Sequence, residues 1–333
     1  MSPNLTGTDR EKRISEKQMT MEQIIGRITT IWKIRPSLHR EQLWFPFFLL
    51  VPSISVMVLV IVFPMLYSFY ISLTDFTLTT ATNVNFVGLA NYWSLFQDPI
   101  FWQAFGRTLL FVALAVNIEL LLGLIIAHMM AKVGFGRDFL RTVIMIPMMF
   151  APILVGFQFK WFFNDQVGLV NNLLWTLTGQ AHIIPWLVDQ RLGFIAILVA
   201  EIWMSTPFMV IILQAGILSL PREPFEAAEV DGASEWQKFR HLTLPMLMPF
   251  IYTAMAIRSL DIARIYDVVS IMTGGGPGHR TELIWTYINR LAFTGQKFAL
   301  GSAMSYITVV LSALFTCWFF YHVINSRWSG EEK

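Results

Sequence analysis

The feature that most limits the fold of this chain is a series of long apolar stretches with few charges. The first, from Gln42 to Thr74, contains no charged residue, and a helix needs only about 20 apolar residues to cross a bilayer core. Only helices or closed barrels satisfy their backbone hydrogen bonds in lipid. The pattern predicts an all-α integral membrane protein with six transmembrane helices, at about 42–74, 104–131, 139–159, 194–218, 244–269 and 298–325.

The composition supports a membrane protein and excludes several other classes. Charged residues make up 14% of the chain and hydrophobic residues 55%, whereas soluble domains carry about 25% charged residues. The only cysteine, Cys317, lies in an apolar run, so neither a disulfide framework nor a cysteine metal site is predicted. The net charge of +2, without a basic patch, argues against nucleic-acid binding. No metal site is predicted.

The distribution of basic residues predicts the orientation in the membrane. With six spans and a cytoplasmic N-terminus, the inner segments hold sixteen Lys or Arg and the outer loops hold five. Cytoplasmic segments are enriched in these residues, so both termini are expected in the cytoplasm. Residues 1–41 are polar and basic and do not resemble a cleavable signal; within them, apolar residues at 21–31 fit either an interfacial helix or a loosely ordered tail.

The most polar internal segment runs from residue 222 to 249, between two uncharged stretches. Pro224 fits the first turn of a helix, where its missing N–H costs nothing. Gly232 can adopt the backbone angles that end a helix sharply, and Ser234 with Gln237 fits a capping box that begins another. The segment predicts a short hydrophilic loop of two small helices, with an alanine face that another protein can approach closely.

This segment resembles the EAA loop of ABC importer permeases, which in that family forms the coupling helix that docks on a cytoplasmic ATPase. The likeness lies in Glu226-Ala227-Ala228, Asp231-Gly232-Ala233, Phe239, Leu242, Leu244-Pro245 and Pro249. The alternative is an interfacial loop whose alanines only fill a helix. The resemblance implies that coupling to an ATPase is carried by Glu226, Ala227, Ala228, Asp231, Gly232, Ala233, Phe239, Leu244 and Pro245.

Ionisable residues inside predicted spans are candidate functional residues, because a charge is costly in hydrocarbon. Arg258, Asp261, Arg264 and Asp267 follow at three-residue steps in the fifth span, so adjacent members are expected to pair. One interpretation is that these four residues line a water-filled path or its outer gate. The other is that they mark the end of a helix at the level of the lipid headgroups.

Four further ionisable residues lie in the second and fourth spans, namely Arg107, Glu119, His128 and Glu201. Glu119 is expected either to face the pathway and bind sugar hydroxyls or to pair with a neighbouring helix or partner subunit. His128 and Glu201 are expected near opposite membrane interfaces. The sequence places no two of these residues in one pocket, so no catalytic residue is predicted.

A glycine-rich stretch, Thr273 to Gly278, follows the fifth span. It is not a phosphate-binding loop, because no Gly-Lys-Ser/Thr ends it. Taken alone it fits a flexible turn. However, Thr-Gly-Gly-Gly-Pro at this position is similar to the sugar-importing branch of the permease family, where it lies near the binding protein and the gate. The resemblance adds Gly274, Gly275, Gly276 and Pro277 to the candidate pathway or gate residues.

The resemblance implies a type I importer permease of the maltose or glycerol-3-phosphate kind. The expected division is a basic cytoplasmic tail (1–43), the first helix with an external loop (44–103), a permease core (104–325) with its coupling loop (219–241), and a cytoplasmic C-terminal tail (326–333).

The resemblance also implies partners: a second permease, two ATP-binding subunits and an external or periplasmic binding protein, at the bacterial inner membrane. The chain is expected to be no enzyme and to need no cofactor, since ATP is bound by the partner ATPase. The expected cargo is a carbohydrate. The alternatives are an ABC permease for glycerol-3-phosphate or a polyamine, and a secondary transporter.

Overall fold

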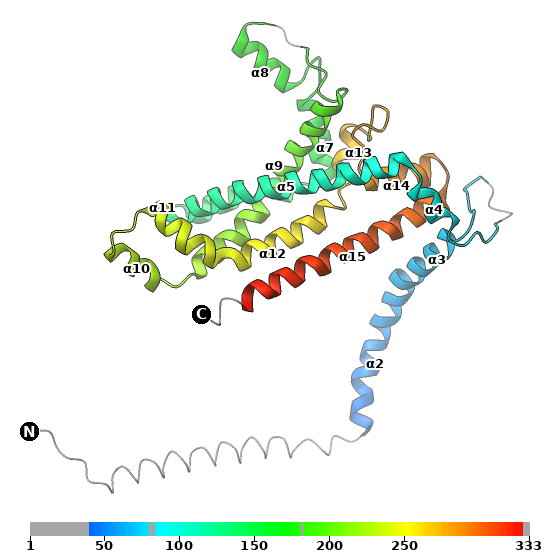
Figure 1. Cartoon of the computed structure of the whole chain (residues 1–333), viewed down its shortest axis with the longest axis horizontal. Coiled ribbons are helices and arrows are strands. Elements are labelled where there is room, and N and C mark those ends of the chain that lie inside the picture. The colour runs from blue at the N-terminus through cyan, green and yellow to red at the C-terminus, as the bar shows by residue number, and fades with distance from the viewer. Residues whose placement is uncertain (1–39, 80–83, 181–182, 329–333) are drawn as a thin grey trace, which may run out of the picture. The chain divides into compact units, whose positions relative to one another are not determined.

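The computed structural model describes residues 40–79, 84–180 and 183–328, and Figure 1 shows their arrangement. Most of the basic tail and the apolar pattern at 21–31 lie outside these residues. The described chain is helical, with one isolated antiparallel bridge between Thr74 and Phe86. It divides into two compact units, Met1–Tyr67 and Ser68–Lys333.

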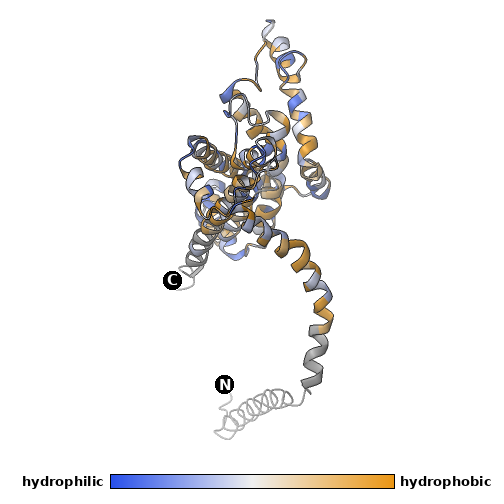
Figure 2. Ribbon diagram, turned by 90° about the vertical axis from the view of Figure 1, so that its right-hand side faces the viewer, coloured by the Kyte–Doolittle hydropathy of each residue, from blue (hydrophilic) through white to orange (hydrophobic). Residues whose placement is uncertain are grey.

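The first unit contains the helix predicted for the first span. α2 (Arg40–Met57) continues through a π-helical turn, η1 (Val58–Val62), into α3 (Phe63–Ser72), which extends into the second unit. Pro64 lacks an N–H, which removes a helical hydrogen bond and accounts for the local widening. All described side chains from Phe48 to Tyr67 are exposed, and Figure 2 shows the apolar character of this helix.

The second unit is built around long helices that match the second, fourth and sixth predicted spans. Asp98 caps the start of the helix that matches the second span, where its side chain accepts a hydrogen bond from the backbone N–H of Ile100 at 2.9 Å. The helices of this unit are α4 (Ala90–Phe96), α5 (Pro99–Lys132), α6 (Arg137–Met145), η2 (Pro147–Met149), α7 (Pro152–Phe162), α8 (Leu169–Thr178), α9 (Gln190–Ser219), α10 (Glu223–Val230), α11 (Glu235–Lys238), η3 (Phe239–Thr243), α12 (Leu244–Ile262), α13 (Asp267–Met272), α14 (Ile284–Asn289), η4 (Arg290–Thr294) and α15 (Phe298–Trp328).

Three described helices are long and apolar enough to cross a membrane: Phe48–Ser72, Pro99–Lys132 and Gln190–Ser219. A shorter apolar stretch, Phe298–Leu314, begins α15. Many large apolar side chains on these helices are exposed, which is the surface that a helix presents to lipid.

The third predicted span is not one helix. α6, η2 and α7 divide it, and α7 starts at Pro152 after an extended Ala151. Prolines at 147 and 152 lack the N–H that a continuing helix needs. The residue before Pro152, Ala151, is extended, as proline favours, whereas Ile146 before Pro147 keeps helical angles. The proline pair therefore converts one expected span into two short helices.

The fifth predicted span is also interrupted. α12 ends at Ile262 and α13 begins at Asp267, so the four residues between them form a non-helical turn, which contains neither proline nor glycine. The charged residues expected along one helix face are therefore divided between α12, this turn and α13.

The main hydrophobic core joins α5, α7, α9, α12 and α13, with Phe111, Met209 and Leu247 among its fully buried side chains. α5 and α9 approach so closely that a Cβ on Gly123 would lie 2.6 Å from the Cβ of Met209. A second core, around Phe101 and Met304, joins α4, α5, α14 and α15.

Candidate functional site

The EAA-like loop, residues 219–241, forms two short helices separated by a sharp turn. Pro224 lies in the first turn of α10, and Gly232 ends that helix with φ +75°. The N–H of Gly232 donates to Glu229 O at 3.1 Å and that of Ala233 to Ala228 O at 2.9 Å, which is the pairing of a Schellman cap. The predicted break after α10 is confirmed.

The second helix of the loop, α11, begins with the predicted capping box. The Ser234 N–H donates to Gln237 Oε1 at 2.7 Å, and Ser234 Oγ accepts from the Gln237 N–H at 3.4 Å. Glu226 and Ala227 on α10 are exposed, and Ala228 is half-buried. The loop therefore presents a short helix whose small residues are open to a partner.

Ion pairs hold the loop together and tie it to the end of α5. Lys132 Nζ, in the last turn of α5, lies 2.6 Å from Glu235 Oε2. Lys238 Nζ contacts Glu235 Oε1 at 2.5 Å and Glu229 Oε1 at 2.8 Å. Hydrogen bonds from Lys132 and then Lys238 lower the pKa of Glu235 to about 2. The sequence did not reveal the Lys132 contact, which spans 103 residues.

Other predicted coupling residues lie at the base of this loop rather than on its exposed helix. The Phe239 ring packs edge-on against His128 of α5, with centroids 5.2 Å apart. Leu244 packs against the main core. Pro245, in the first turn of α12, follows the π-helical turn η3. These residues join the loop to the helical bundle.

A charge cluster, consisting of the buried residues Glu119, Glu201 and Arg258 and the exposed Asp261, lies where α5, α9 and α12 meet. Arg258 donates from Nε to Glu119 Oε2 at 2.8 Å and from Nη2 to Glu119 Oε1 at 3.1 Å. It also donates to Glu201 Oε1 at 2.8 Å and to Asp261 Oδ2 at 2.5 Å. Glu119 is 0% exposed, and Glu201 and Arg258 are each 4% exposed. One guanidinium therefore serves three carboxylates.

This cluster gives Glu119 the partner on a neighbouring helix that was one of its predicted alternatives. Glu201 is buried in the bundle, where it pairs with the same arginine. The expected pairing along the fifth span holds for Arg258 and Asp261 only. Among the described residues no ion pair joins Arg264 to Asp261 or Asp267, because α12 ends at Ile262.

A cavity of about 450 Å³ adjoins this cluster. Its wall carries Glu201, Asp261, Arg264 and Asp267 together with two aromatic side chains, Tyr266 and Trp285. Three predicted pathway residues, Asp261, Arg264 and Asp267, thus share one cavity with Glu201, which the sequence could not place there. The two aromatic residues were missed, since nothing in the local sequence distinguishes them from membrane-interface aromatics.

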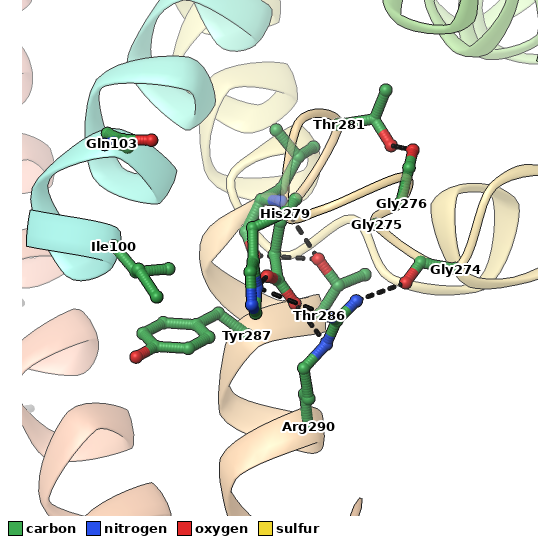
Figure 3. Close-up of polar contacts among 12 residues, drawn as sticks. Ile100, Gln103, Gly274, Gly275, Gly276, His279, Thr281, Thr286, Tyr287 and Arg290 are labelled. Atoms are coloured by element: carbon green, nitrogen blue, oxygen red, sulfur yellow. Dashed lines mark hydrogen bonds and ion pairs between the residues drawn. The ribbon is translucent and has the colours of Figure 1, made fainter. Parts of the chain in front are cut away.

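The glycine-rich stretch forms an ordered turn between α13 and α14, shown in Figure 3. Arg290 Nε lies 2.9 Å from Glu282 Oε1, and Arg290 Nη2 donates to Gly274 O at 2.8 Å. Glu282 also pairs with His279, whose backbone oxygen accepts from Arg107 of α5 at 2.6 Å. The turn is therefore fixed by side chains and differs from the flexible turn that glycines alone suggest.

Within this turn, Gly274 and Gly275 have positive φ angles of 61° and 80°. Gly276 O accepts a hydrogen bond from Thr281 Oγ1 at 2.8 Å, and Pro277 follows it. These four predicted gate residues lie together, and none of them is among the residues that line the 450 Å³ cavity.

The fold and these sites define a polytopic α-helical membrane protein that exposes a polar two-helix loop tied to its longest helix. Residues 119–329 match the family model described as "Binding-protein-dependent transport system inner membrane component". The chain belongs to this family, and it is an ABC transporter permease.

Relatives and solved structures agree with this assignment. The chain is 34% identical to the probable ABC transporter permease protein y4oQ of Sinorhizobium fredii, over 88% of this chain and 93% of the relative. It is 34% identical to the trehalose/maltose transport system permease protein MalF of Thermococcus litoralis, over 81% of this chain and 90% of the relative.

The fold is similar to that of a chain in a bacterial ABC transporter involved in the import of the acidic polysaccharide alginate. The TM-score is 0.74 at 21% identity, over 89% of this chain and 99% of that chain. The predicted permease fold is therefore confirmed.

Proposed function

We propose that this chain is the membrane-spanning subunit of an ATP-driven importer that carries a carbohydrate across a bacterial inner membrane. The observation that carries the proposal is the exposed α10, which an ion pair ties to α11, the helix that Lys132 at the end of α5 holds in turn. Relatives named as trehalose, trehalose/maltose and sulfoquinovosyl glycerol transport permeases support a sugar cargo.

In this proposal the chain works with a second permease, two ATP-binding subunits and an external solute-binding protein. Both termini and the EAA-like loop lie in the cytoplasm. The chain carries no catalytic residue of its own, and ATP is bound and hydrolysed by the partner ATPases. Glu226 to Ala233 dock on an ATPase, and Phe239, Leu244 and Pro245 pass its movement to the helical bundle, which alternates between outward and inward access.

The docking role makes a substitution test possible. Ala228→Arg places a long cationic side chain on the half-buried face of α10, and Gly232→Arg places an L-residue with a Cβ at a position with φ +75°. Each variant is expected to lose ATP-driven uptake while its amount in the membrane stays near that of the wild type. Ala90→Arg, on the exposed start of α4, is the matched control and should transport normally.

Co-purification supplies the second readout. The wild-type chain is expected to retain both ATPases through detergent extraction, and Ala228→Arg is expected to release them. Wild-type uptake by both loop variants would refute the docking role. Uptake by vesicles that contain no ATPase would instead identify a secondary transporter.

A further inference from the structure

The 450 Å³ cavity has an acidic wall. Four ionisable side chains line it, namely Glu201, Asp261, Asp267 and Arg264. Arg264 Nε is engaged with the backbone oxygen of Leu260 at 3.3 Å, and the Asp261 side chain is 62% exposed. A solute in this space therefore meets carboxylates on more than one side.

The buried arginine beside the cavity does not offset this charge. Arg258 contacts Glu119, Glu201 and Asp261 together, so its single positive charge is opposed by three carboxylates. Among the groups that line the cavity, three carboxylates (Glu201, Asp261 and Asp267) stand against one guanidinium, that of Arg264. A cleft whose wall carries one sign of charge attracts or repels solutes according to their own charge.

The remaining lining groups suit a polyol. Carboxylates accept hydrogen bonds from hydroxyl groups, and Tyr266 and Trp285 offer aromatic faces beside them.

We infer that this cavity admits uncharged carbohydrates and discriminates against anionic ones such as uronates and sugar phosphates. The inference rests on the proposed function and deepens it, because it separates a neutral sugar from the glycerol-3-phosphate alternative. The fold shared with an alginate importer carries no substrate assignment. Relatives named for trehalose and trehalose/maltose name neutral sugars, whereas the relative named for sulfoquinovosyl glycerol names a sulfonate, so the inference rests on the wall of this cavity alone.

Cysteine labelling tests the charge of the cavity without a known substrate. In a Cys317→Ser background, Met204→Cys and Tyr266→Cys each place a thiol on the cavity wall, and Leu177→Cys places one on exposed, uncharged α8. The probes are neutral, anionic and cationic methanethiosulfonates of similar size. Relative to the neutral probe, the anionic probe is expected to react about tenfold more slowly in the cavity than at residue 177.

Charge variants assign the effect to the wall. Asp267→Asn should reduce the discrimination and Asp267→Lys should abolish it, whereas Asp165→Asn, an equivalent change outside the cavity, should leave it unchanged. Equal rates for anionic and neutral probes at both cavity positions would overturn the inference. So would discrimination that is insensitive to Asp267.

Direct binding completes the test and keeps it distinct from the proposed function. The permease pair in nanodiscs, without the binding protein, is titrated with maltose, trehalose, a mannuronate disaccharide and putrescine. A neutral disaccharide is expected to bind best, and preferential binding of the uronate or of putrescine, or no binding at all, would overturn the inference. Failure of ATPase co-purification would instead sink the permease proposal, whatever the labelling shows.

Discussion

Arg258 of α12 binds both carboxylate oxygens of Glu119 on α5, through Nε at 2.8 Å and Nη2 at 3.1 Å. Two parallel donors on a planar guanidinium fix the geometry as well as the charge of such a pair. Because Glu119 is fully buried, the pair determines how α5 and α12 sit against each other.

Removing the guanidinium is expected to destabilise the protein strongly. Arg258→Gln leaves Glu119 and Glu201 buried without a cationic partner, and such a loss costs about 3–5 kcal/mol. Thermal unfolding of the purified protein in detergent measures it. Asp261→Asn, which changes the exposed arm of the same cluster, should shift the unfolding temperature far less. Equal shifts for the two variants would contradict the importance of the buried pair.

The contact between α5 and α9 predicts a second stability effect. A Cβ on Gly123 would lie 2.6 Å from Met209 Cβ, so Gly123→Val forces the two helices apart, and overpacking of this kind costs about 1–3 kcal/mol. Gly106 on the same helix has no atom near a built Cβ, so Gly106→Ala should be neutral or stabilising. Unfolding temperatures that move together in both variants would argue against close packing at Gly123.

Gly275, in the glycine-rich turn, predicts an effect of substitution on local backbone dynamics. Its φ is +80°, and a Cβ there would lie 3.1 Å from Arg290 Nη2 and 3.3 Å from the Glu282 Cβ. Left-handed angles cost an L-residue about 1–2 kcal/mol. Gly275→Ala is therefore expected to raise the rate of hydrogen exchange in the 273–283 turn without changing that of α9. Gly134→Ala is the control, because a Cβ at Gly134 would meet no other atom within 4 Å. Unchanged hydrogen exchange in the 273–283 turn of Gly275→Ala would count against close packing at Gly275.

The tether between α5 and α11 has a defined pH dependence. The pKa of Glu235 is lowered to about 2 by Lys132 and Lys238, so the contact stabilises the fold above the unfolded pKa near 4.5 and is lost as the pH falls towards 2. The effect of Glu235→Gln on unfolding temperature should be constant from about pH 6 to 8 and should shrink in acid. Salt screens exposed ion pairs, so the effect of Glu235→Gln on the unfolding temperature should also fall at high ionic strength. Glu223→Gln is the control. An effect of Glu235→Gln that grows in acid would refute the assignment.

The sequence predicted the features that depend on neighbouring residues. Helix-breaking Gly232 and the capping pair Ser234 and Gln237 act over three residues or fewer, so the two-helix loop could be predicted before its structure was known. Long apolar stretches with few charges likewise predicted the helices that became α5 and α9.

The features that depend on distant residues could not be read in this way. Glu119 and Arg258 are 139 residues apart, and several polar residues in the spans were equally plausible partners until the helices were packed. The turn between α12 and α13 carries neither proline nor glycine, so no local signal marked it. The cavity wall therefore combined residues that the sequence had assigned to different places.

α5 has a consequence beyond its role as a span. At about 1.5 Å per residue, its 34 residues exceed the roughly 30 Å thickness of a bilayer core. Arg107, near the beginning of α5, donates a hydrogen bond to the backbone oxygen of His279 in the turn that follows α13. Lys132, in its last turn, forms an ion pair with Glu235 of the EAA-like loop. Figure 1 shows these regions at opposite ends of the helix. One uninterrupted helix therefore links the glycine-rich turn and the EAA-like loop through direct side-chain contacts near its two ends.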